Sequence, residues 1–126
     1  MSLRSPLGQA RGLGSAKDGV GHWWLQRLTA LALIPLSLWF VYSLVRFPLT
    51  DYETMVAWIK APLVAVALVL FFAAAFLHAA LGVQVVIEDY VGGEGKKLLS
   101  IVIAKFVLYA LGVASIFAVL KIAFGA

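Results

Sequence analysis

The chain has 126 residues, of which 63% are hydrophobic and only 13% are charged, and its mean hydropathy is +1.02. Soluble domains carry about a quarter charged residues, so this composition argues against a soluble fold. The absence of cysteine excludes a disulfide scaffold, an iron–sulfur cluster held by this chain and a thiolate zinc site, but leaves histidine-ligated haem open. A net charge of +4 in so apolar a chain indicates membrane topology rather than nucleic-acid binding.

The N-terminal segment, residues 1–27, is basic and rich in glycine. It has no continuous apolar stretch before the first long uncharged run, so a cleaved signal peptide is not expected. The first predicted transmembrane helix follows at residues 28–46, because 18 uncharged residues at about 1.5 Å each cross most of a hydrocarbon core of about 30 Å. Pro35 lies inside this span, where we expect a packing kink.

Two further apolar stretches predict the second and third transmembrane helices, at residues 61–88 and 98–124. Pro62 stands at the first turn of the second helix, a position that suits proline. The third contains Lys105 near its start and Lys121 near its end, and both side chains can extend to opposite membrane surfaces. The sequence therefore predicts an all-α membrane protein with three transmembrane helices.

The connections between these helices are polar. Residues 47–60 form a predicted connector with a short amphipathic turn, and residues 89–97 form a predicted glycine-rich loop. The N-terminal segment, this loop and the adjoining Lys105 together carry seven Lys or Arg residues, whereas the opposite side carries three. The positive-inside rule then predicts a cytoplasmic N-terminus and loop 89–97, a periplasmic connector and a periplasmic C-terminus.

His78 lies deep in the second predicted helix, ten positions before its acidic end, which is about 15 Å below the cytoplasmic boundary. An imidazole at that depth is costly unless it pairs or binds a metal. One interpretation is a hydrogen bond to a serine or carbonyl of another helix, and the other is a haem ligand. Gly82, one turn further on the same face, and the small Ala74 and Ala75 suit either a haem edge or close helix packing.

Glu88, Asp89 and Tyr90 end the second helix at the predicted cytoplasmic surface. Asp89 projects from nearly the same helix face as His78, because eleven residues make about 1,100° of rotation. One face of this helix could therefore carry a buried ligand, His78, and an acid at the surface, Asp89. The alternative is that Asp89 only marks the helix end and that Tyr90 is an aromatic-belt residue.

The run from His22 to Arg27, HWWLQR, precedes the first predicted span. It is either an interfacial anchor of Trp and Arg or an anion site, in which Arg27 makes bidentate contacts to a carboxylate such as a haem propionate. His22 and His78 differ in depth by an expected 15 Å or so, so they cannot readily share one iron. A six-coordinate haem would need its second histidine from another polypeptide.

Two segments carry a resemblance to a known family. HAALGVQVVIEDY, from His78 to Tyr90, resembles the second-helix signature of the small membrane-anchor subunit of succinate dehydrogenase (succinate:quinone oxidoreductase, complex II). RGLGSAKDGVGHWWLQRLTALALIPL, from Arg11 to Leu36, resembles the alphaproteobacterial branch of that subunit. The resemblance covers essentially the whole chain.

The resemblance implies a role for each candidate residue. His78 matches the axial histidine of haem b and is the expected ligand of its iron. Tyr90 matches the tyrosine that hydrogen-bonds a quinone carbonyl, with Asp89 as its acidic neighbour. Arg27 matches the arginine near the haem propionates, and His22 is the least secure of these matches. No residue of this chain is expected to be catalytic by itself.

The resemblance also implies partners and location. A cytochrome b anchor subunit would supply the second haem histidine, while FAD and iron–sulfur clusters would lie in the flavoprotein and iron–sulfur subunits, and ubiquinone would be the substrate. We therefore expect a multi-pass subunit of the bacterial inner membrane, surrounded by lipids, that serves the tricarboxylic acid cycle and the respiratory chain and binds no nucleic acid.

Two other functions remain open from the sequence. The chain could be a small transporter or its accessory subunit, with His78 as a proton relay, although neither a charged residue at mid-membrane nor an inverted repeat supports this. It could also be an assembly subunit without redox cofactors. A reducible b-type absorption band in the purified complex would separate the haem interpretation from both.

Overall fold

The computed structural model describes residues 5–7 and 17–125, and most of the longer range is helical. Within residues 17–125, four helices follow one another: α2 (Lys17–Arg46), α3 (Tyr52–Lys60), α4 (Pro62–Tyr90) and α5 (Glu94–Phe124). Three of them are long and apolar enough to cross a membrane, over Gly19–Arg46, Pro62–Tyr90 and Glu94–Phe124. The predicted all-α class with three membrane-spanning helices is therefore confirmed for the described part of the chain. The membrane boundaries and the orientation of the termini stay predictions.

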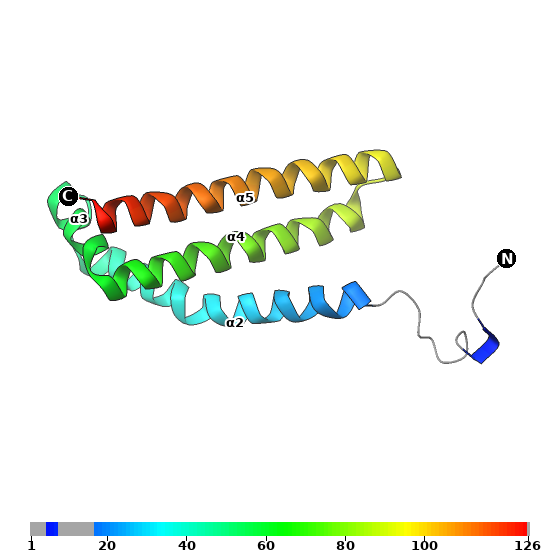
Figure 1. The fold of residues 1–126 in the computed structure, drawn as a ribbon, viewed down its shortest axis with the longest axis horizontal. Helices are drawn as coiled ribbons and strands as arrows, with labels where there is room; N and C mark the ends of the chain where they lie inside the picture. Colours follow the sequence, from blue (N-terminus) through cyan, green and yellow to red (C-terminus); the bar gives the residue numbers. More distant parts are fainter. Residues whose placement is uncertain (1–4, 8–16, 126) are drawn as a thin grey trace.

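The three long helices form an open layer with α4 in the middle (Figure 1). α4 packs against α2 on one side and α5 on the other, whereas the backbones of α2 and α5 do not approach each other closely in the described part of the chain. Of the most apolar window of each span, only 11%, 17% and 6% is buried, for α2, α4 and α5 respectively. Most of the surface of these helices therefore needs lipid or the helices of a partner to cover it.

Local signals set the ends of the helices. Pro62 occupies the first turn of α4, where its missing N–H would have no helical partner. Gly93, with φ of 85°, turns the chain between α4 and α5 in a conformation that favours glycine. The connection is therefore only residues 91–93, shorter than the predicted loop 89–97, because Glu94 already lies in the first turn of α5.

The predicted connector contains a complete helix, α3, rather than a short amphipathic turn. Its N-cap is Asp51, whose carboxylate accepts hydrogen bonds from the Thr54 hydroxyl at 2.7 Å and the Thr54 N–H at 3.0 Å. The hydroxyl bond first, and the N–H bond second, hold the pKa of Asp51 below its usual value. The cap therefore contributes stability above about pH 4 and loses it as the pH falls through the lowered pKa.

α3 closes the end of the layer that lies near the C-terminus (Figure 1). Its Ile59 is buried together with Leu68 of α4 and Val119 of α5. Trp58 of α3 stacks on Trp39 of α2, with ring centroids 5.8 Å apart. α3 thus connects all three long helices at one end, while the other end, where α2 begins, stays open.

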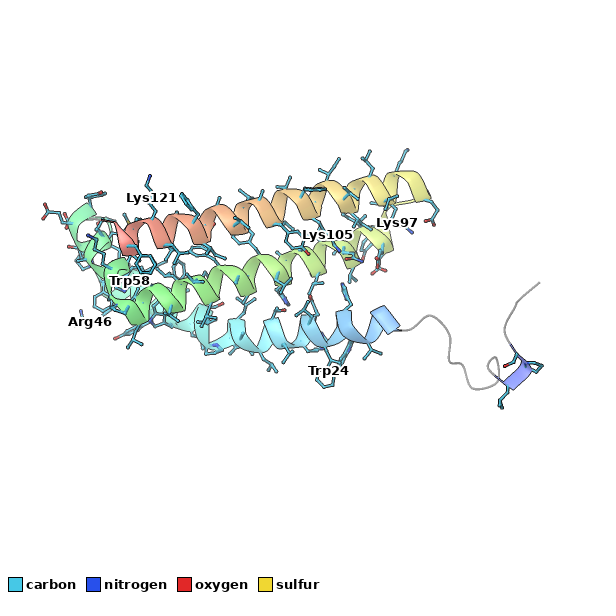
Figure 2. The ribbon with its side chains drawn as sticks, in the orientation of Figure 1. Trp24, Arg46, Trp58, Lys97, Lys105 and Lys121 are labelled. Carbon is cyan, nitrogen blue, oxygen red and sulfur yellow. The ribbon has the colours of Figure 1, made fainter. Side chains whose placement is uncertain are left out.

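Basic residues lie at both ends of the layer, as the sequence predicts. Figure 2 shows Arg46 and Lys121 towards the α3 end and Lys97 at the opposite end. Trp24 points away from α4 on the outer side of α2 (Figure 2), which suits an interfacial anchor.

α4 and α5 pack closely at Gly112. A Cβ added to this buried glycine would lie 3.0 Å from the Phe76 Cβ and 3.2 Å from its Cγ. These are not the flexible end of a side chain, so a larger residue would push the two helices apart. Gly112 therefore sets the distance between α4 and α5.

We predict that Gly112→Leu lowers the free energy of unfolding by about 1 to 3 kcal/mol, the usual cost of overpacking a core. The measurement is an SDS titration of the protein in lipid, followed by circular dichroism. Gly95→Leu is the matched control, because nothing lies within 4 Å of a Cβ at that position. Equal stability of the two variants would show that Gly112 does not limit the approach of α4 and α5.

Candidate functional site

The site is built on a hydrogen bond between α2 and α4. The Thr29 Oγ1 of α2 lies 3.0 Å from the His78 Nδ1 of α4. Among the described residues, it is the only side-chain hydrogen bond that joins two of the long helices. Thr29 is 6% exposed and His78 is half-buried, so the bond satisfies two polar groups inside otherwise apolar helices.

This bond is the interhelical partner that the sequence analysis weighed for His78, with a threonine in place of a serine or carbonyl. It uses only one of the two ring nitrogens. The other, Nε2, has no hydrogen-bond partner among the described residues. The structure therefore gives His78 a structural contact and leaves one nitrogen for another molecule.

A cavity of about 400 Å³ with several polar lining residues lies one helical turn from His78, between the first half of α2 and the second half of α4. It is lined by Gly19, His22, Trp23, Gln26, Arg27, Gly82 and Val85. A Cβ at Gly82 would lie 3.7 Å from the Gln26 Nε2, an ordinary contact, so the missing side chain leaves the cavity wider without being required by the packing. The cavity has room for a charged group of a ligand or for water.

Two buried polar atoms at this cavity lack a partner in the described part of the chain. They are the Nε2 of His22 and the Oε1 of Gln26. Buried polar atoms in native proteins are nearly always hydrogen-bonded, so a ligand or water is needed to satisfy them. Arg27 lies at the same cavity with its guanidinium 5.2 Å from the centre of the Trp23 ring, a contact that holds the cation near the opening.

His22 and His78 are separate in the structure. Thr29 is level with His78, and His22 precedes Thr29 by seven residues, which is about 10 Å along the helix. This is less than the expected 15 Å or so, because α2 already begins at Lys17 and carries His22 inside the helix rather than ahead of it. The separation is still too large for the two rings to share one metal ion.

Asp89 and Tyr90 lie in the last turn of α4, away from this cavity. Both side chains are exposed, and Tyr90 is exposed to 85%. Their neighbour Glu88 accepts a hydrogen bond of 2.9 Å from the Gln84 Nε2 within the same helix. The structure thus brings Arg27, His22 and His78 to the α2–α4 interface, whereas Asp89 and Tyr90 need another chain to complete any site around them.

The residues at the interface fit one axial position of a haem. An axial histidine must present an unprotonated nitrogen, and His78 has one ring nitrogen without a partner. A carboxylate side group of such a ligand needs cations and donors nearby, which Arg27 and the amide of Gln26 provide at the cavity. No three His, Cys, Asp or Glu side chains within the described ranges gather to hold a metal by themselves.

Thr29 and Gln26 were missed by the sequence analysis. A signal was present, because His22, Gln26 and Thr29 are spaced four and three residues apart and so share one face of a helix. The spacing does not show which residue of α4 lies opposite Thr29, because that depends on how the two helices are aligned.

Comparisons with known proteins agree on one family. A family model described as "Succinate dehydrogenase/Fumarate reductase transmembrane subunit" matches residues 1–112. The succinate dehydrogenase hydrophobic membrane anchor subunit of Rickettsia bellii is 38% identical over 89 residues, which are 71% of each chain. The subunit of the same name from Paracoccus denitrificans is 29% identical over 126 residues, which are 100% of this chain and 97% of its own.

Proposed function

Because the chain belongs to the family of succinate dehydrogenase/fumarate reductase transmembrane subunits and is a membrane anchor subunit of succinate dehydrogenase, we propose that it contributes to haem b and ubiquinone sites. The family and the three apolar helices make it a multi-pass protein of the bacterial inner membrane. As an anchor subunit it is not an enzyme by itself. The observation that carries the proposal is the unpartnered Nε2 of His78, presented from the middle of α4.

His78 is the proposed axial ligand of the haem iron. Its Nδ1 is held by Thr29 at 3.0 Å, so the ring is fixed while Nε2 stays available. A bound haem supplies one-electron transfer between the soluble subunits and the quinone. The second axial histidine comes from the companion cytochrome b subunit, since His22 is about 10 Å from the level of His78.

Arg27 is the proposed partner of a haem propionate. The guanidinium is placed at the mouth of the α2–α4 cavity by its contact with Trp23. His22 lines the same cavity and can donate a ring N–H to a carboxylate, and the unpartnered Oε1 of Gln26 can accept a hydrogen bond from water beside it. His22 therefore acts beside the haem rather than on its iron.

Tyr90 and Asp89 are proposed to form one side of the ubiquinone site. The Tyr90 hydroxyl can donate a hydrogen bond to a quinone carbonyl, and Asp89 can orient water or pass a proton while the quinone takes up two electrons and two protons. Both side chains are exposed at the end of α4, which is accessible to a ligand and to the iron–sulfur subunit. The remainder of the pocket is then built by the partner subunits.

The open layer supports the proposed assembly. α2 and α5 leave both faces of α4 without a helix across them, and an anchor of a multi-subunit enzyme must offer such surfaces to other subunits. The companion cytochrome b subunit covers the face from which His78 reaches a shared haem. The iron–sulfur and flavoprotein subunits attach at the end where α2 begins and α4 ends.

We predict that the end of the molecule where α2 begins and α4 ends is cytoplasmic, and that the C-terminus is periplasmic. The reason is that this end carries seven Lys or Arg residues, whereas the opposite end carries three. Alkaline phosphatase fused after Ala126 should then be active in whole cells, since that enzyme needs the periplasm. A cytoplasmic reporter at the same position should be inactive. The reverse pattern would contradict the proposed orientation.

For the haem, we predict that His78→Ala or His78→Tyr abolishes or changes the b-type spectrum of the purified complex, because an axial nitrogen is lost. His22→Ala is the matched control and should keep iron coordination. The measurement is the reduced-minus-oxidised absorption spectrum at equal amounts of assembled complex. An unchanged spectrum in both His78 variants would overturn the ligand assignment.

For the quinone, we predict that Tyr90→Phe lowers quinone reduction by roughly tenfold or more. Loss of a donor to a partly desolvated carbonyl costs about 1 to 3 kcal/mol, and each ~1.4 kcal/mol is a factor of ten in rate. Succinate oxidation with an artificial acceptor that takes electrons upstream should stay near the parent value. Asp89→Asn should show the same difference between the two assays, with a shifted pH profile.

Tyr52→Phe is the control for Tyr90→Phe, since Tyr52 is an exposed tyrosine on α3 at the opposite end of the molecule. It should leave both assays unchanged. Full quinone reductase activity in Tyr90→Phe would assign Tyr90 to the aromatic belt instead. A parent complex without any b-type band would favour the assembly role without redox cofactors.

A further inference from the structure

We infer that Thr29 is a positioning residue for the haem, which fixes the tautomer of His78 so that Nε2 is the nitrogen that binds iron. The inference rests on the proposed haem function. It goes further by assigning a role to a residue of α2 that binds neither iron nor substrate, and by stating which protonation form of the ring is present.

The hydrogen bonds of the Thr29 hydroxyl determine this form. Oγ1 lies 2.8 Å from the carbonyl oxygen of Leu25, 3.0 Å from that of Gln26, and 3.0 Å from the His78 Nδ1. A hydroxyl has one proton to donate and lone pairs that accept. Two oxygens do not approach to 2.8 Å without a proton between them, so the hydroxyl proton points to a backbone carbonyl of α2.

His78 must then be the donor in the third contact. With the Thr29 proton directed at a carbonyl, the only attractive arrangement is a Nδ1–H of His78 that donates to Oγ1. A neutral imidazole carries one N–H, so Nε2 bears a lone pair and no proton. That is the form in which a histidine binds a metal.

The opposite tautomer, with the proton on Nε2, would be unfavourable in two ways. Oγ1 would donate to Nδ1 and face the Leu25 carbonyl oxygen at 2.8 Å without a proton, and Nε2–H would be a donor with no acceptor among the described residues. Unsatisfied polar groups are expensive inside a membrane. The buried position of Thr29 also keeps water from replacing either hydrogen bond.

The series of hydrogen bonds Nδ1–H···Oγ1–H···O=C affects the bound iron as well as the orientation of the His78 ring. A hydrogen bond that accepts from the distal N–H of a ligating histidine raises the basicity of the other nitrogen and fixes the ring, and its removal usually costs 10- to 100-fold in metal affinity. A more basic nitrogen favours ferric over ferrous iron. Thr29 therefore both strengthens haem binding and lowers the midpoint potential of the haem.

The test compares Thr29→Val with Thr29→Ser in the whole assembled complex. Valine has nearly the shape of threonine without its hydroxyl, whereas serine keeps the hydroxyl and is the matched control. We expect Thr29→Val to weaken haem affinity by about 10- to 100-fold. We also expect the midpoint potential of the haem to rise. The expected rise is about 59 mV for each tenfold loss in the preference of the site for ferric over ferrous iron. Thr29→Ser should stay close to the parent in both measurements.

A second measurement does not depend on how the variants assemble. The chain has only two histidines, so His22→Ala leaves His78 as the single histidine signal in a ¹⁵N NMR spectrum of the haem-free full chain in lipid. At pH 8 we expect a protonated Nδ1 and an unprotonated Nε2. The opposite tautomer would overturn the inference, even where Thr29→Val fails to assemble.

The outcomes separate this inference from the proposed function. In one outcome, the parent complex has a b-type spectrum that needs His78, but haem affinity and midpoint potential are equal in Thr29→Val and Thr29→Ser. That outcome would overturn the role of Thr29 and leave the haem ligand in place. A parent complex with no b-type spectrum would overturn the haem proposal and the role of Thr29 with it.

Discussion

The cost of a polar group inside lipid is the constraint on which the arrangement of this chain depends. His78 stands in the middle of a helix whose neighbours along the sequence are alanine, leucine and glycine. Without a partner, such a ring would oppose insertion of α4. The Thr29 hydroxyl of α2 provides the partner, and the same contact fixes which part of α2 lies beside which part of α4. One hydrogen bond thus satisfies one ring nitrogen of His78 and aligns the two helices.

The alignment of α2 and α4 places the other polar residues. Once Thr29 is level with His78, the earlier turns of α2 carry Gln26 and His22 to the level of Gly82 and Val85, where they border the cavity. Arg27 follows at the rim. On the other side of α4, the close approach of Gly112 to Phe76 gives α5 its own fixed position. α2 therefore contacts α4 through the Thr29–His78 hydrogen bond and the stacked rings of Phe40 and Phe71, whereas α5 approaches α4 closely at Gly112.

The open layer explains why a single anchor chain does not complete its own sites. The backbones of α2 and α5 do not approach each other closely in the described part of the chain, and most apolar side chains of the spans are exposed. Tyr90 projects from the end of α4 without any surrounding wall. In a membrane these surfaces have to be covered by lipid or by other subunits, in agreement with membership of a family of transmembrane subunits.

The sequence predicted the three long helices because the charged residues, Pro62 and the apolar runs between them leave few alternatives in a membrane. It did not predict that α2 begins at Lys17 or that α5 begins at Glu94. Hydropathy locates the apolar core, and a helix can continue beyond that core. The residues His78 and Arg27 could be selected as unusual polar groups, but Thr29 could not be paired with His78, because the register of two helices follows from packing that no single segment encodes.

An experimental structure of the complete complex, purified from the membrane, tests the central claim most directly. The account predicts that the Nε2 of His78 is bonded to haem iron while its Nδ1 stays within hydrogen-bond distance of the Thr29 hydroxyl. A complex in which Nε2 instead contacts a partner side chain or lipid, with no iron beside it, would contradict the account.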